Sequence, residues 1–106
     1  MKLQIKRNDI MASEITIVKY HGDFEIKYIR TATDQRGKGY ASKLLEKAKA
    51  KFSSLVAFLD PDGTGLTVDQ MEAWYKRHGF KKQRYDFDRY ARGLRRNIKT
   101  VMYWEE

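Results

Sequence analysis

The chain has 106 residues, a formal net charge of +8 and no cysteine. That length supports one core but not two, so a single domain over residues 1–106 is expected. The lack of cysteine excludes disulfides and thiolate zinc sites and favours an intracellular, cytoplasmic location, and no stretch approaches the length of a membrane span. The positive charge favours anionic partners, which include small anionic ligands, acidic protein surfaces and nucleic acids.

Three strands are predicted in the first third of the chain. Leu3 and Ile5 alternate with polar neighbours, as in a short strand. After about six further residues, a second strand rich in β-branched residues runs from Glu14 to Tyr20. A turn at residues 21–23 leads into a third strand from Phe24 to Thr31. Together they predict an antiparallel meander.

The stretch from Gln35 to Leu45 joins the third strand to a helical pattern. Gly37 and Gly39 have no Cβ and reach positive φ values at little cost, so the backbone here can approach a ligand closely. The amino end of a helix exposes unpaired N–H groups and the positive end of its dipole, and Arg36 and Lys38 add charge. The stretch therefore predicts an anion site, with a solvated basic turn as the alternative.

A helix is predicted from about residue 40 to 52, because its apolar residues recur three or four apart. Its exposed side carries Lys43, Lys47, Lys49 and Lys51. The continuous apolar run at residues 55–59 is typical of a strand buried on both faces. The third strand, the loop, the helix and this strand together predict one right-handed βαβ unit.

Residues 60–65 form a turn-rich loop with two aspartates. The terminal Glu of a calcium loop is missing, so a structural turn is predicted and no metal is expected. Thr67 and Gln70 match a capping box, and the helix that follows has Tyr75 and His78 on its inward side and stops at Gly79. Strands are predicted at residues 81–87 and, closing the chain, at residues 98–104.

Two motifs resemble those of the GNAT family of acyl-CoA-dependent N-acyltransferases. Arg36 to Ala41 reads R-x-x-G-x-A and resembles the pyrophosphate-binding motif of the family, (Q/R)-x-x-G-x-(G/A). Tyr75 to Phe80 reads Y-x-x-x-G-F and resembles a second family motif. Their order and separation also fit, so residues 14 to 104 are identified as a member of this family.

The resemblance implies an α+β fold with two main helices and a mixed, mostly antiparallel sheet. The strand ending at Thr31 and the strand at residues 55–59 would run parallel and splay apart at their carboxyl ends, with acetyl-CoA bound between them as the acyl donor. Its pyrophosphate would lie on N–H groups of the glycine loop and its pantetheine arm along the first of these strands. The implied cofactor-binding residues are Ile29, Arg30, Thr31, Arg36, Gly37, Lys38, Gly39, Tyr40, Ala41 and Ser42.

The implied reaction is direct transfer of an acetyl group to an amine, without a covalent enzyme intermediate. Tyr75 matches the family tyrosine that protonates the departing thiolate, while a tyrosine of the core is the alternative interpretation. Glu25, on the strand facing the cleft, is a candidate base that acts directly or through water. A surface carboxylate paired with Lys27 explains Glu25 equally well.

The chain departs from the family pattern in two places. After the buried strand it has Asp60 and a turn, where family members often carry an Asn-containing segment. Most members also insert one or two helices between the first two strands, and these helices cover the acceptor site. An uncovered acceptor side suits a residue on a macromolecule, above all a protein lysine, better than an enclosed metabolite. In this respect the chain looks most like phage-encoded, acetyltransferase-type anti-CRISPR proteins, which implies a role in phage counter-defence.

The stretch from Lys81 to Asn97 has seven Lys and Arg against two Asp, with three aromatic residues interleaved. Four arginines are predicted to dock the acceptor, an acidic or nucleic-acid-bound protein: Arg89, Arg92, Arg95 and Arg96. A solvated loop and a direct nucleic-acid contact are the other interpretations. The alternative function is therefore a catalytically silent GNAT fold that binds nucleic acid or a protein through this basic third. The intact glycine motif and Tyr75 favour the enzyme.

Overall fold

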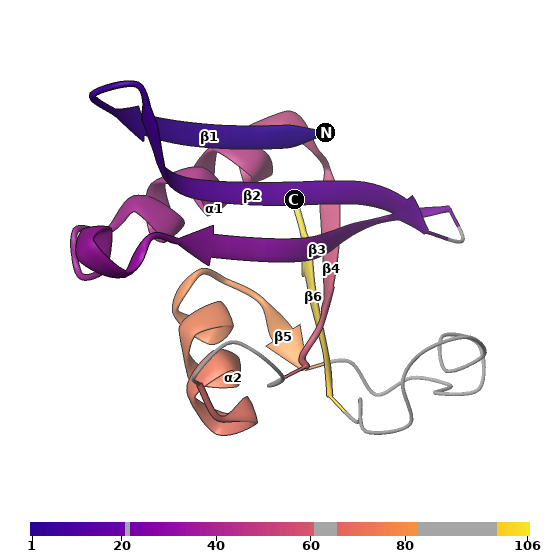
Figure 1. The fold of residues 1–106 in the computed structure, drawn as a ribbon. Helices are drawn as coiled ribbons and strands as arrows, with labels where there is room; N and C mark the ends of the chain where they lie inside the picture. The colour runs from indigo at the N-terminus through magenta and orange to yellow at the C-terminus, as the bar shows by residue number, and fades with distance from the viewer. Residues whose placement is uncertain (21, 61–65, 83–99) are drawn as a thin grey trace.

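The computed structural model describes residues 1–20, 22–60, 66–82 and 100–106, which form one mixed sheet with two helices (Figure 1). The elements are β1 (Lys2–Arg7), β2 (Ile10–Tyr20), β3 (Asp23–Thr31), a 3₁₀ turn η1 (Thr33–Gln35), α1 (Tyr40–Lys51), β4 (Ser54–Phe58), α2 (Val68–Arg77), β5 (Lys81–Lys82) and β6 (Val101–Glu105). The strands are ordered β1-β2-β3-β4-β6-β5. The expected α+β class is confirmed. No helix in these ranges is long and apolar enough to cross a membrane.

Strands β1 and β2 are joined by a two-residue turn. Asn8 and Asp9 both have positive φ, 53° and 62°, as the tightest hairpin turns require. The predicted gap of about six residues was wrong, because Arg7 pairs with Ile10 and Lys6 with Met11. Strand β2 thus begins four residues before Glu14. It begins there because it pairs with β1, since the composition of this stretch alone does not indicate a strand.

Helix α1 covers one face of the meander and lies behind β1, β2 and β3 in Figure 1. Its apolar stripe, Leu44, Leu45 and Ala48, has no solvent exposure and belongs to the same buried cluster as Ile15 and Ile26. Burial of such side chains contributes roughly 25 cal/mol for each Å² removed from water, so this stripe holds the helix to the sheet. No helix in the described ranges lies over the opposite face of β1–β3.

Strands β3 and β4 run parallel and part almost at once. In the described part of the chain their ladder has one pair of partners, Glu25 opposite Val56. Strand β4 instead pairs antiparallel with β6 along its whole length, from Ser54 opposite Glu105 to Phe58 opposite Val101. The predicted splay is therefore confirmed, and β3 keeps an edge without a strand partner from Ile26 onward.

Helix α2 begins and ends as its sequence predicts. Thr67 Oγ1 accepts from Gln70 N at 3.1 Å, and Gln70 Oε1 accepts from Thr67 N at 2.9 Å. Gly79 follows the helix at φ 85°, and its N–H donates to the Lys76 carbonyl oxygen at 3.1 Å. Of the strand predicted at residues 81–87, the described part is β5.

Lys49 does not lie on the solvated side of α1, so that prediction was wrong. Its Nζ donates to the carbonyl oxygen of His78 at 2.8 Å and lies 5.2 Å from the centre of the Trp104 ring. A lysine at the carboxyl end of a neighbouring helix satisfies a carbonyl that has no partner inside that helix. Lys49 thus ties α1 to the end of α2.

Candidate functional site

The glycine loop delivers the amino end of α1 with its N–H groups exposed. Gly37 and Gly39 have φ values of 83° and 76°, which side chains with a Cβ rarely adopt. Gly39 is the N-cap, no side chain caps the helix, and its first turn has no acidic residue. The N–H groups of residues 40–42 therefore have no carbonyl partner within the helix, and the helix dipole adds positive potential there. This end of α1 can bind an anion.

A hollow of about 240 Å³ opens at this point. Its lining is formed by Thr31, Gln35, Arg36, Gly37, Gly39, Tyr40, Ala41, Ser42 and Trp74. A Cβ built on Gly39 would meet no protein atom within 4 Å, so a methyl group there causes no steric clash with the protein. The structure thus brings together seven of the ten predicted cofactor-binding residues.

Two lining residues, Gln35 and Trp74, were not predicted. The position of Trp74 on the inward side of α2, next to Tyr75, was a signal that sequence analysis could have used. Of the predicted residues outside the lining, Lys38 donates from Nζ to Gln35 Oε1 at 3.0 Å. Lys38 is therefore bonded to a residue that lines the hollow.

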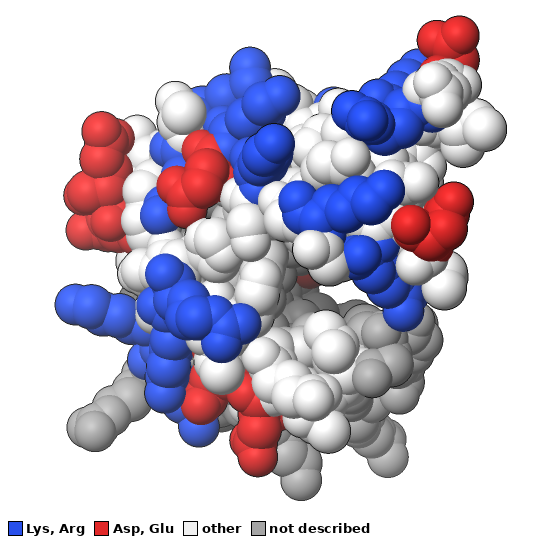
Figure 2. All heavy atoms as spheres, turned by 90° about the vertical axis from the view of Figure 1, so that its left-hand side faces the viewer, with Lys and Arg blue, Asp and Glu red and all other residues white. Residues whose placement is uncertain are grey.

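Positive charge surrounds the hollow. Arg36 lies along its wall, where Nε donates to the Thr31 carbonyl oxygen at 3.4 Å. Figure 2 views the molecule from the side on which the loop lies, and it shows more Lys and Arg than Asp and Glu around a largely uncharged centre. Such a field attracts anions before any direct contact forms.

The free edge of β3 continues from the hollow at Thr31. The Arg30 carbonyl oxygen accepts from Ser13 Oγ at 3.0 Å, and Ala32 N donates to the Ala12 carbonyl oxygen at 2.8 Å, so both backbones face β2. Because backbone groups alternate along a strand, those of Ile29 and Thr31 face the free edge. Of the three predicted strand positions, these two can bond to an extended ligand. The Arg30 side chain instead lies 4.8 Å from the centre of the Tyr28 ring.

Glu25 lies where β3 and β4 meet, on the face of the sheet away from α1. Its neighbour Phe24 packs against Phe52 at the end of α1, with ring centres 4.7 Å apart, and alternation turns Glu25 to the other side. The side chain is half-buried. Burial raises the pKa of this carboxyl, and the charge of Lys27 offsets part of that rise. A raised pKa suits a group that must accept a proton.

Tyr75 lies in the core, on the α1 side of the sheet, and is 6% exposed. Its ring is 5.0 Å from those of Trp74 and Phe80, centre to centre. Burial raises the pKa of the phenol, so the hydroxyl stays protonated and able to donate at every pH at which an enzyme works. Tyr75 thus lies on the α1 side of the sheet and Glu25 on the opposite face.

Sequence analysis missed a polar cluster between the helices. Ser42 Oγ lies 3.1 Å from His78 Nε2, and His78 Nδ1 lies 2.9 Å from Glu46 Oε1. Ser42 and Glu46 are four residues apart and therefore share one face of α1, which was a readable signal. That His78 lies between them follows only from the packing of α2 against α1.

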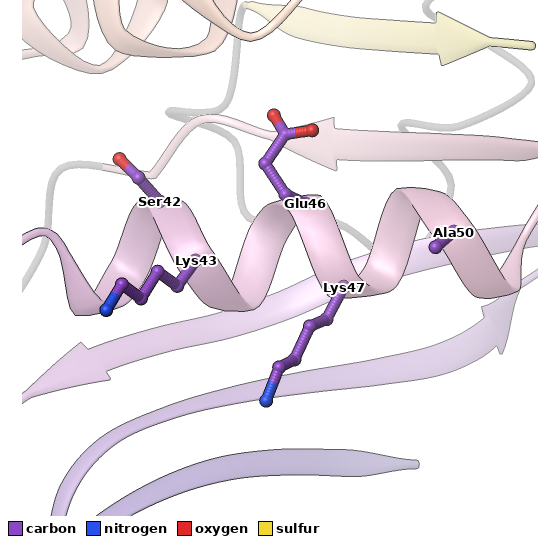
Figure 3. A pocket seen from close by; sticks show the side chains of 5 residues that line it. All are labelled: Ser42, Lys43, Glu46, Lys47 and Ala50. Atoms are coloured by element: carbon purple, nitrogen blue, oxygen red, sulfur yellow. The ribbon is translucent and has the colours of Figure 1, made fainter.

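The proposed docking arginines, Arg89, Arg92, Arg95 and Arg96, lie outside the described residues, so their role stays a prediction. A second hollow of about 500 Å³ on α1 is lined by Ser42, Lys43, Glu46, Lys47 and Ala50 (Figure 3). It shares Ser42 with the first hollow. In the described ranges, no group of three or more His, Asp or Glu could hold a metal ion.

A sequence model of the acetyltransferase (GNAT) domain matches residues 5–82. The match includes the glycine loop, Glu25 and the motif that begins at Tyr75. The chain therefore belongs to the GNAT acetyltransferase family. Among curated protein sequences, none matches it.

Solved structures share the fold. The Bacillus subtilis N-acetyltransferase YlbP, in complex with coenzyme A, is 13% identical with a TM-score of 0.73, over 99% of this chain and 67% of that one. The Escherichia coli ribosomal-protein-S18-alanine N-acetyltransferase is 15% identical with a TM-score of 0.66, over 99% and 68%. The anti-CRISPR protein AcrVA5 is 13% identical with a TM-score of 0.68, over 98% of both chains.

The similar structures allow two comparisons, of chain length and of the cofactor bound. The chain spans between 24% and 67% of the length of the first three similar structures, but nearly all of AcrVA5. The expected resemblance to anti-CRISPR acetyltransferase folds is thus confirmed. The expected use of acetyl-CoA agrees with the coenzyme A in YlbP and with the family.

Replacing Gly39 by Ala should weaken coenzyme A binding about 10- to 100-fold, the effect of losing one hydrogen bond to a charged group. Because Gly39 lines the hollow, we expect the added methyl group to hinder the close approach of a pyrophosphate to the N–H groups at the start of α1. Isothermal titration calorimetry with coenzyme A measures the change.

Gly22→Ala is the matched control for this variant. Gly22 has φ 85° and nothing within 4 Å of a built Cβ, so both substitutions carry similar backbone strain, about 1 kcal/mol. If the two variants bound coenzyme A with equal affinity, the glycine loop would not be part of the binding site.

Proposed function

We propose that the protein is an acetyl-CoA-dependent N-acetyltransferase that acts on a lysine side chain of a protein. The observation that carries this proposal is the continuity of two features at Thr31. This residue ends the free edge of β3 and also lines the hollow at the amino end of α1. Together they offer a long ligand an extended edge and an anion site in sequence.

The chain would bind the acyl donor with its backbone. The N–H groups at the start of α1 would hold the pyrophosphate, with Arg36 beside them. The backbone groups of Ile29 and Thr31 would bond to the pantetheine arm as they would to an added strand. The thioester supplies an activated acetyl group when the donor is bound. Beyond Glu25 and Val56 the edge of β3 has no strand partner in the described chain, so its backbone is available to the arm.

The uncovered face of β1–β3 supports a macromolecular acceptor. Tyr28 is 45% exposed on this face, and no helix of the described chain lies over it. A lysine side chain can enter such a face while its protein stays outside. A protein acceptor also appears in the name of the similar S18-alanine N-acetyltransferase.

The amine must lose a proton before it can attack. At pH 7 about one lysine in 2,500 is neutral, a cost of roughly 4.6 kcal/mol. Glu25, half-buried on the acceptor face, accepts that proton directly or through water. Tyr75, whose hydroxyl burial keeps protonated, would supply the proton for the departing thiolate.

A catalytically silent fold that binds nucleic acid or protein is the second candidate. The formal net charge of +8 favours it, as does the basic stretch from Lys81 to Asn97, most of which lies outside the described residues. The hollow and the half-buried Glu25 favour the enzyme, because a binding module requires neither.

Incubation of the protein with acetyl-CoA and cell lysate should yield new acetyl-lysines, identified by mass spectrometry. The Gly39→Ala variant should give far fewer of them, and Gly22→Ala should match the wild type. If the wild type binds coenzyme A but acetylates nothing, the enzyme proposal fails and the silent fold takes its place.

The Tyr75→Phe variant should lower kcat about 10- to 1,000-fold with little change in stability, because the ring keeps its packing and only the donor is lost. Tyr103→Phe is the matched control, since that hydroxyl bonds to Glu105 at the outer end of β6. Turnover of Tyr75→Phe at the wild-type rate would leave Tyr75 as a core residue.

The pH dependence of kcat/KM in the Glu25→Gln variant tests whether Glu25 is the base. Protonation inactivates Glu25, and its raised pKa places this loss of activity at higher pH than for an ordinary glutamate. We expect kcat/KM of the wild type to fall as pH drops through that pKa. In Glu25→Gln the break at that pKa should vanish and leave only the smooth fall caused by protonation of the lysine amine, with activity at pH 7 about 100- to 10,000-fold lower. Identical profiles for the same acceptor peptide would exclude Glu25.

A further inference from the structure

Three polar side chains form a chain of hydrogen bonds that ends at the hollow. Glu46 Oε1 lies 2.9 Å from His78 Nδ1, and His78 Nε2 lies 3.1 Å from Ser42 Oγ. Figure 3 shows Ser42 and Glu46 one turn apart on the same side of α1. Ser42 also lines the hollow, next to the N–H groups of the helix.

His78 is held firmly in this position. It is the C-cap of α2, where its N–H donates to the Tyr75 carbonyl oxygen at 3.0 Å. Its own carbonyl oxygen accepts from Lys49 Nζ at 2.8 Å, and its ring lies 4.8 Å from that of Trp74. Because these contacts fix both the backbone and the ring of His78, its imidazole can change protonation state without moving.

The chemistry of Glu46 decides which nitrogen of His78 carries the proton. The hydrogen bond from His78 is the main cause that lowers the pKa of Glu46, so Glu46 is an ionised carboxylate that can only accept. His78 Nδ1 must then donate, and in a neutral imidazole Nε2 is left as an acceptor. Nε2 therefore accepts a hydrogen bond from the Ser42 hydroxyl, which uses the one proton of that hydroxyl. The lone pairs of Ser42 Oγ then face the hollow and repel an anion.

We propose that His78 is a positioning residue for the cofactor: it takes up a proton when the pyrophosphate binds, and so turns the Ser42 hydroxyl into a donor to that pyrophosphate. The proton enters at Nε2, which then donates to Ser42 Oγ. The Ser42 proton, released from the imidazole, points to a pyrophosphate oxygen. This inference rests on the proposed function, because it requires coenzyme A to bind at the hollow.

The charged groups near His78 have opposite effects on its protonation. Glu46 favours an imidazolium, whereas Lys49, from the same helix, opposes it, and Lys49 Nζ is itself 3.5 Å from Glu46 Oε1. In the described residues, β6 contributes the Trp104 ring beside Lys49 but no charge at the imidazole. Glu46 and Lys49 act in opposite directions, and the negative charge of a bound pyrophosphate adds to the effect of Glu46.

The order acid, histidine, serine also occurs in serine hydrolases. Here Ser42 lies on the wall of the anion site, at the opposite end of the β3 edge from Glu25, so it faces the phosphates and not the thioester. Acetylation of Ser42 during incubation with acetyl-CoA, seen by mass spectrometry of the intact protein, would overturn the positioning role.

Calorimetry with dephospho-coenzyme A tests the proposal. This probe keeps the pyrophosphate and lacks the 3′-phosphate, whose own titration near pH 6 would obscure the result. At about pH 8, where a histidine side chain is mostly neutral, we expect uptake of up to one proton, measured from the binding enthalpy in buffers of different ionisation enthalpy. Affinity should rise about 10-fold from pH 8 to pH 6, within the limit of tenfold per pH unit that linkage sets for the uptake of one proton.

Two variants and one control separate the steps. Ser42→Ala should remove the pH dependence and bind at pH 6 as weakly as the wild type does at pH 8. In His78→Gln the amide donates to Ser42 at every pH, so affinity should stay near the wild-type value at pH 6. His21→Gln, which removes the only other histidine of the sequence, should behave as the wild type does. Circular dichroism verifies that each variant is folded.

The outcomes are distinct. If the wild type does not bind the probe, both the proposed function and this inference fail. If it binds without proton uptake, or if His78→Gln and Ser42→Ala keep the full pH dependence, only the role of His78 is overturned.

Discussion

The divergence of β3 from β4 is the constraint on which the rest of the site depends. Two adjacent parallel strands normally share hydrogen bonds along their length. Here they share one position, Glu25 opposite Val56, whereas β4 pairs over its whole length with β6 and β3 with β2. Each strand is thus held by its outer neighbour, and the gap between them does not depend on a ligand. The free edge of β3 is a property of the fold.

Local chemistry made the amino end of α1 predictable. Leu44, Leu45 and Ala48 recur at helical spacing, and their burial fixes which side of the helix meets the sheet. The glycines before them adopt the positive φ values that only glycine adopts cheaply. The capping box at Thr67 and the stop at Gly79 are local in the same way, so the start and end of α2 could also be read from sequence.

Contacts between distant residues could not be predicted. His78 meets Glu46 across 32 positions and Ser42 across 36, and no local pattern indicates which side chains two packed helices bring together. Lys49 was assigned to solvent by its place in a run of lysines, yet the carboxyl end of α2 covers it. The start of β2 at Ile10 was missed for the same reason, since pairing with β1 creates it.

The position of β6 sets the order in which the molecule is completed during synthesis. Strands β1–β3 and helix α1 pair mainly with segments close in sequence, so they can assemble while the chain is still being made. Strand β6 emerges after all the other described strands, but it lies between β4 and β5 in the interior of the sheet. The β4 side of the cleft therefore has no partner until residues 101–105 leave the ribosome. A nascent chain thus contains the glycine loop and α1 before β4 has its antiparallel partner.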